Sequence, residues 1–140
     1  MRAAFYAPLK APDHPLPSGD RTMARLLLRA LQQGGHTVEL ACRFRSFEGA
    51  GEPDRQHRLA QMGDRLAHAL IRRYRRRPLH DRPELWLTYH LYHKAPDWLG
   101  PAVSRALAIP YVVAEASYSP KQQTGPWTQG CIASRTALAA

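Results

Sequence analysis

The stretch that decides the fold is YAPLKAPDHPLPSGDRTMARLLLRAL, residues 6–31, in which a short apolar run passes through a proline-rich loop into a helix. From Gly19 onward the apolar residues recur at spacings of three and four, which indicates one face of a helix. Ser18 or Asp20 can cap its start, and Gly34 and Gly35 can end it. Before the loop, residues 2–8 have the length and composition of a buried strand. Because α/β proteins bind ligands in such loops, this is the first place to look for function.

The rest of the chain continues the alternation of strand and helix patterns. In chain order we expect a strand at 36–44, a loop at 45–56, a helix at 59–77, a strand at 83–90, a helix at 97–108 whose regular part follows Pro101, and a strand at 109–116. The apolar run Val112, Val113, Ala114 suits a strand that is covered on both faces, as in parallel sheets. This order predicts an α/β domain with a Rossmann-like, doubly wound parallel sheet and helices on both faces.

Length and composition restrict the class of protein. The chain has 140 residues, 44% of them hydrophobic, which is enough for one domain with a real core. No apolar run approaches the roughly 18–20 residues that a membrane span needs, so we expect a soluble protein. Cys42 and Cys131 lie far apart and match no zinc or redox spacing, which favours a reducing, cytoplasmic location.

The charge of the chain predicts an anionic partner. The formal net charge is +9, and much of it lies in IRRYRRRP, residues 71–78. Nucleic acid, acidic lipid headgroups or a phosphorylated substrate would each explain it, and so would a solvated helix end where cations favour the helix dipole. No helix-turn-helix, RNA-recognition or zinc-finger signature accompanies the arginines, so we expect no specific nucleic-acid partner.

Ligands of doubly wound sheets bind outside the carboxyl ends of the strands, which directs attention to the loops at 8–20, 89–97 and 115–126. The first loop has neither G-x-G-x-x-G nor a P-loop motif. Gly19 at a helix N-terminus still allows backbone N–H groups to approach an anion, although an ordinary turn or cap would also explain it. His90 and His93 have no carboxylate or cysteine close in sequence, so no metal site is expected.

Four segments together resemble a known family. They are the strand ending YAP at residues 6–8, the loop sequence PSGDR at 17–21, LQQGGHTVEL at 31–40, which is similar to a recurring L-x-x-x-G-H-x-V-x-V pattern, and IPYVVAEASYSPKQQTGPW at 109–127. They resemble the N-terminal domain of a GT-B glycosyltransferase, in particular of the retaining family 4, over essentially the whole chain. The nucleotide-sugar domain of that family, with its Glu-x7-Glu signature, has no counterpart here. The resemblance therefore implies that residues 1–140 form the acceptor-side domain of a longer enzyme and are inactive alone.

The resemblance implies transfer of a sugar from a nucleotide-diphosphate sugar, the co-substrate, to a hydroxyl of a glycan, lipid or cell-envelope polysaccharide precursor. It implies retention of configuration, no bound cofactor and no metal. Gly19 would meet the donor diphosphate through its backbone N–H group. The other residues that the resemblance and the loop positions assign to phosphate or substrate binding are Ser18, Asp20, Arg21, His90, Ser117 and Lys121.

Glu115 departs from the family pattern. Many relatives have a histidine after the strand that corresponds to 109–116, where this chain has Glu115 and Ser117. Glu115 is therefore the candidate catalytic residue, as a local base or as a ligand of sugar hydroxyls.

The resemblance also gives the arginine cluster a second meaning, because family members often dock on the cytoplasmic membrane face through basic residues. The residues that would contact anionic lipid are Arg72, Arg73, Arg75, Arg76 and Arg77. The alternative function is a non-catalytic Rossmann-like module that binds a nucleotide, a sugar or a polyanion.

Overall fold

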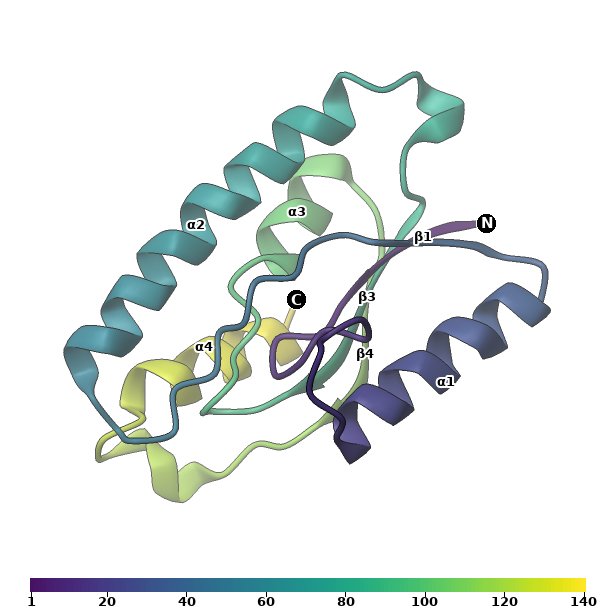
Figure 1. Cartoon of the computed structure of the whole chain (residues 1–140). Helices are drawn as coiled ribbons and strands as arrows, with labels where there is room; N and C mark the ends of the chain where they lie inside the picture. The colour runs from purple at the N-terminus through teal and green to yellow at the C-terminus, as the bar shows by residue number, and fades with distance from the viewer.

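A computed structural model describes residues 1–140 (Figure 1). Its elements are β1 (Arg2–Tyr6), α1 (Gly19–Gln33), β2 (Thr37–Leu40), α2 (Pro53–Arg75), the 3-10 turn η1 (Leu79–Asp81), β3 (Leu85–Leu91), α3 (Gly100–Leu107), β4 (Tyr111–Ala116), the 3-10 turn η2 (Pro120–Gln123) and α4 (Thr128–Leu138). The four strands form one sheet in the order β2-β1-β3-β4, and every neighbouring pair is parallel. The predicted fold class, an α/β domain with a doubly wound parallel sheet, is confirmed.

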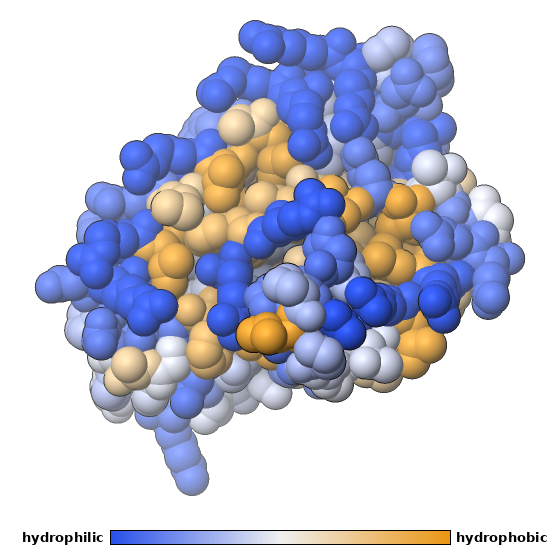
Figure 2. All heavy atoms as spheres, in the orientation of Figure 1, coloured by the Kyte–Doolittle hydropathy of each residue, from blue (hydrophilic) through white to orange (hydrophobic).

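The two faces of the sheet are covered by different helices, as the alternation of side chains along the strands requires. Tyr6 and Trp86 point to one face, where they pack with residues of α2 and α3. Phe5 and Leu87 point to the other, where they pack against α1. Figure 1 shows the same division, with α1 on one side of the sheet and α2 and α3 on the other. In the same view, apolar residues gather between α1 and α2, and hydrophilic residues dominate the outer rim (Figure 2).

The strand order reverses between β1 and β3. β2, the next strand after β1 in the chain, lies on one side of β1, whereas β3 lies on its other side. The chain therefore runs from β1 to one side of the sheet and returns to β3 on the other side of β1. No single connection covers the carboxyl ends of both β1 and β3. This is the switch point at which doubly wound sheets bind ligands.

Three local expectations were wrong. β2 ends at Leu40, because residues 41–48 leave the sheet as an extended segment; Ser46 N donates to Pro8 O and Glu48 N to Lys94 O. α2 begins at Pro53 and not near Leu59. β4 is an edge strand and Val112 is 41% exposed, so it is not covered on both faces.

A buried carboxylate fixes the start of α3. Asp97 is 3% exposed and accepts hydrogen bonds from the backbone N–H groups of Leu99 and Gly100, both at 2.8 Å. The hydroxyl groups of Thr88 and Tyr111 donate to its other oxygen, at 2.5 and 2.9 Å. This network connects the start of α3 to the middle of β3 and to the first residue of β4. None of the helices combines the length and the apolar character that crossing a bilayer would need.

Candidate functional site

The candidate site lies at the switch point, where the start of α1 meets the carboxyl ends of β3 and β4. His90 Nδ1 lies 2.7 Å from Asp20 Oδ1, and His90 Nε2 lies 3.9 Å from Glu115 Oε1. The side chain of His90 is 20% exposed, that of Asp20 34% and that of Glu115 57%. The imidazole ring of His90 thus lies between the carboxylates of Asp20 in α1 and Glu115 in β4, and the cluster is partly exposed to solvent. The structure brings together three of the residues that the sequence singled out separately.

Unusual backbone conformations bring His90 and Glu115 to this position. Their φ angles are +59° and +67°, in the left-handed region that side chains other than glycine rarely adopt. The two residues lie side by side, because the pairs Tyr89–Ala114 and Leu91–Ala116 flank them in the β3–β4 register. Regular alternation would turn His90 toward the α2 and α3 face, whereas the kink directs it to Asp20 of α1. Strain of this kind, on the order of 1–3 kcal/mol per residue, concentrates at functional sites.

The start of α1 is open to an incoming anion. Ser18 is the N-cap, and its Oγ accepts from Arg21 N at 3.2 Å. Gly19 is exposed, and a Cβ built on it would meet no atom within 4 Å. The backbone therefore leaves free space beside the first helical turn, where the helix dipole favours negative charge. Asp20 occupies part of this region, so an anion would share it with a carboxylate.

The guanidinium of Arg21 has hydrogen-bond partners within the chain. It donates to the carbonyl of His14 at 2.9 Å, which ties the loop before α1 to the helix. Three further arginines hold the same loop: Arg25 donates to Pro12 O, Arg45 donates to Leu9 O, and Arg43 pairs with Asp13. The loop at 8–18 is therefore fixed by arginine side chains from α1 and from the segment after β2.

Two residues at this site were missed in the sequence. Tyr92 stacks on His90, with ring centroids 5.3 Å apart and planes at 24°. Burial, and then the negative charge of Asp20, raises the pKa of Tyr92, while Arg45 acts in the opposite direction. For Tyr89, burial followed by the charges of Glu115 and Asp20 raises the pKa to about 12. Both phenols therefore stay protonated around neutral pH and offer O–H donors beside the carboxylates. In the sequence, only the aromatic residues at 89–92 indicated that this segment could supply such donors.

The remaining predicted site residues lie at the margin. Ser117 is exposed just after β4, and its backbone N–H donates to Leu91 O at 3.0 Å. Lys121 is exposed in η2, and the structure gives it no hydrogen bond or ion pair with the cluster. Trp127 is the residue that precedes the first turn of α4, and its Nε1 donates to Glu48 O at 3.1 Å. His93 contacts Trp127 edge to face; burial, aided by Lys94, lowers the pKa of His93.

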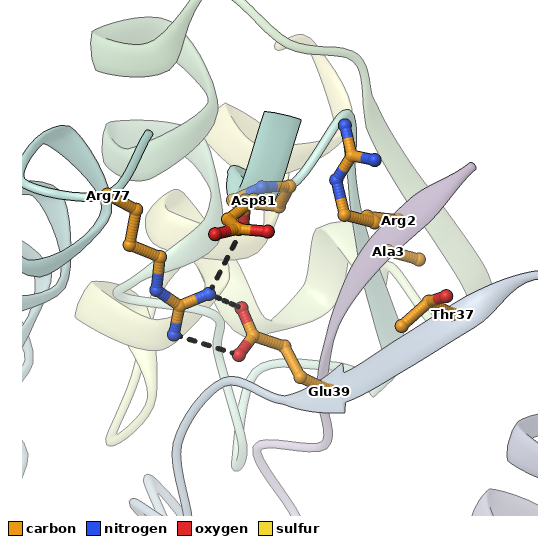
Figure 3. Close-up of a pocket in the computed structure, with 7 residues that line it drawn as sticks. Arg2, Ala3, Thr37, Glu39, Arg77 and Asp81 are labelled. Carbon is orange, nitrogen blue, oxygen red and sulfur yellow. Dashed lines mark hydrogen bonds and ion pairs between the residues drawn. The ribbon is translucent and has the colours of Figure 1, made fainter. Parts of the chain in front are cut away.

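The arginine cluster lies at the end of α2, near the amino ends of the strands. Arg77 forms a two-pronged ion pair with Glu39, at 2.9 and 3.0 Å, beside a hollow of about 410 Å³ (Figure 3). Arg73 donates to Ala41 O, and Arg75 donates to Ala106 O. Arg72 and Arg76 are exposed and make no side-chain hydrogen bond within the chain. The cluster thus divides into three arginines that serve the fold and two that face solvent.

No three His, Cys, Asp or Glu side chains are grouped so that they could hold a metal ion. The fold and the site together define the class: an α/β protein whose polar cluster lies at the ligand-binding edge of a doubly wound sheet. No family model, curated protein or solved structure matches the chain. Any particular activity is therefore inferred from the site itself.

Proposed function

We propose that this chain is the acceptor-side domain of a GT-B glycosyltransferase that transfers a sugar from a nucleotide-diphosphate donor to an acceptor hydroxyl. One observation carries the proposal: the Asp20–His90–Glu115 cluster lies beside the open N-terminus of α1 at the switch point. A helix N-terminus suits a diphosphate, and a histidine flanked by carboxylates suits sugar hydroxyls. The sequence resemblance to the family supports the same assignment.

The donor diphosphate would lie against the first turn of α1, next to Gly19. A leaving diphosphate gains negative charge, and preorganised backbone N–H groups stabilise such charge without reorganisation. Hydroxyl groups would then bind on the other side of the cluster, to His90, Glu115 and the phenols of Tyr89 and Tyr92. The arginines that bind the loop at 8–18 would keep that loop in place during the reaction.

The test is a screen of the full-length protein for transfer and donor hydrolysis with UDP- and GDP-sugars, followed by Gly19→Val. Valine fits sterically, since a Cβ at Gly19 meets no atom within 4 Å, yet its methyl groups would occupy the space assigned to the phosphate. We expect turnover to fall at least 100-fold with an unchanged melting temperature. Gln32→Val introduces the same side chain near the other end of α1 and is the control. Undiminished turnover of the Gly19 variant would contradict the diphosphate position, and a non-catalytic module would show no turnover with any donor.

We also propose that the exposed arginines dock the protein on anionic membrane. Leu79, 78% exposed in η1, lies two residues after Arg77 and offers an apolar contact just past the end of α2. Each cation near an anionic surface contributes about 1 kcal/mol, so removing two should weaken binding about 30-fold. The experiment compares cosedimentation of Arg72→Gln/Arg76→Gln with Arg58→Gln/Arg65→Gln, which removes two exposed charges from the same helix. Equal losses would show that binding follows total charge and not this end of α2.

A further inference from the structure

Two cations near the carboxyl end of β3 have no carboxylate partner. Arg45 is exposed; its Nε donates to Leu9 O at 2.8 Å, and its guanidinium lies 4.8 Å from the centre of the Phe47 ring. Its terminal NH2 groups bind nothing within the chain. Lys94 Nζ lies 4.5 Å from the centre of the Trp127 ring, and neither cation forms an ion pair. Because Arg45 is already held in place, it loses little conformational freedom when it binds an anion.

Backbone hydrogen bonds bring the two cations to the same edge of the sheet. Glu48 N donates to Lys94 O at 2.8 Å, so the segment that carries Arg45 runs beside the loop that follows β3. This loop is a tight turn, in which Tyr92 and Ala95 exchange backbone hydrogen bonds of 3.0 and 3.3 Å. The turn gives Lys94 a fixed backbone position beyond the end of the strand.

A row of aromatic rings connects these cations with the candidate site. Tyr92 stacks on His90, and the ring centre of His93 lies 5.4 Å from that of Tyr92. Trp127 continues the row at 5.7 Å from His93. Tyr92, His93 and Trp127 are each partly exposed. The row therefore offers apolar ring surface to the C–H groups of a sugar, together with the polar atoms of a phenol and an imidazole.

The two ends of the aromatic row carry opposite charge. The carboxylates of Asp20 and Glu115 lie at the end near α1 and β4, and Arg45 and Lys94 lie at the other. Burial and then the charge of Asp20 raise the pKa of Tyr92, whereas Arg45 lowers it, so Tyr92 is close to charges of both signs. Carboxylates accept hydrogen bonds from hydroxyl groups, and cations bind anions, so a ligand that has both kinds of group fits in one direction only.

We propose that the acceptor is an acidic glycan whose anionic group, a carboxylate or a phosphate, binds to Arg45 and Lys94. The inference rests on the proposed function and names its class of acceptor. The terminal NH2 groups of Arg45 match the oxygens of either anion, and Lys94 adds a second charge. The sugar rings that follow the anionic group lie along the aromatic row, and the hydroxyl groups at the other end of the acceptor bind beside Asp20 and Glu115.

The test measures binding by the full-length protein and needs no turnover. NMR titration compares cellobiose with cellobiouronic acid, in which a carboxylate replaces a CH2OH group, and with a phosphorylated cellobiose. We expect at least one acidic probe to bind about 10-fold more tightly than cellobiose, since hydrogen bonds between charged groups are the strong ones. Arg45→Gln and Lys94→Gln should each remove most of this difference and leave the affinity for cellobiose unchanged.

Two features of the chain make these variants informative. Arg43→Gln is the matched control, because Arg43 is exposed on the same segment but is paired with Asp13. The side chain of Lys94 makes no hydrogen bond, so Lys94→Gln removes a charge without releasing the loop that Arg45 also holds.

Either acidic probe supports the inference, and the one that binds more tightly identifies the anion as a uronic acid or a phosphate. Equal affinity for acidic and neutral probes, no binding of any probe, or an equal loss in Arg43→Gln overturns the inference. A loss of UDP or GDP affinity in Arg45→Gln also overturns it, because the cation then serves the donor. Turnover without an acidic preference overturns this inference alone. The absence of transfer to acidic and neutral acceptors alike, with every donor, overturns the proposed function.

Discussion

Glu48 is the buried carboxylate whose removal should destabilise the fold most clearly. It is 2% exposed and lies between β2 and α2. Its oxygens accept from the backbone N–H groups of Ala50, Gly51 and Glu52 at 2.8, 2.8 and 3.2 Å, and from Gln56 Nε2 at 3.1 Å. Substitution of Glu48 by Gln keeps the size of the side chain but replaces one accepting oxygen by a donating NH2 group.

The expected loss of stability follows from the unequal number of hydrogen bonds that the two oxygens of Glu48 accept. Oε1 accepts one bond, from Ala50, and Oε2 accepts the other three, so the least harmful rotamer of Gln places its NH2 group toward Ala50 N–H. The partly buried N–H group of Ala50 then loses its acceptor, which costs about 1 kcal/mol, and the three remaining bonds, now to a neutral oxygen, lose about 2 kcal/mol together. We expect Glu48→Gln to lose about 3 kcal/mol, which lowers the urea midpoint by about 1.5 M if m is about 2 kcal/mol per M.

The assay is urea denaturation between pH 3 and pH 8, with Glu52→Gln as the control, since Glu52 is exposed and its side chain caps nothing. Burial alone would raise the pKa of Glu48, but the N–H groups outweigh it and lower the pKa below the ordinary 4.5. The folded state therefore favours the ionised form, and this stabilisation is present above pH 4.5 and lost as the pH falls through the lowered pKa. The difference in urea midpoint between the wild-type protein and Glu48→Gln should therefore become smaller as the pH falls below 4.5. A Glu48→Gln midpoint equal to that of Glu52→Gln, or a gap independent of pH, would refute the reasoning.

Substitutions at three further positions test local features by the same denaturation assay. Ala108→Gly should stabilise by about 1 kcal/mol, because Ala108 ends α3 at φ +54°, where glycine has no steric cost; a loss would contradict that conformation. Gly63→Ala should destabilise by about 1–3 kcal/mol, because the new Cβ would overlap Trp98, although alanine is the better helix former; a gain would show that α2 and Trp98 pack less closely. Ser18→Ala should cost about 1 kcal/mol and Ser18→Gly only a few tenths, and equal losses would argue against the cap bond.

The sequence predicted α1 well because the residue types at its two ends define its boundaries. Ser18 caps the start and Gly34 ends the helix, as the pattern indicated. The start of α2 carried an equally local signal, since Pro53 is the first helical residue and Asp54 lies in the first turn. The prediction fails there because Gly, Pro and charged residues are dense across 45–56, a composition that favours a loop and hides the helix start.

The site was predicted as a set of loops but not as a cluster. Asp20 and His90 are separated by 70 residues, and only the parallel pairing of β1 with β3 brings them together. The kink at Glu115 has no local signature, and the one at His90 has only the modest tendency of histidine toward a positive φ. The two residues lie opposite each other where β3 pairs with β4, and this long-range contact could not be inferred from either strand alone.

The excess of positive charge has an internal explanation as well as an external one. Eight arginines donate to backbone carbonyl groups of the chain itself: Arg2, Arg21, Arg25, Arg45, Arg73, Arg75, Arg77 and Arg82. A guanidinium has five N–H donors in a rigid plane, so it can satisfy carbonyl groups of irregular segments while part of it remains hydrated. These arginines keep their positive charge, but side chains bound in this way are less free to contact an anionic partner directly. The arginines that bind the loop before α1 instead hold the candidate site in place, which makes Arg→Lys changes there a loss of site geometry at constant charge.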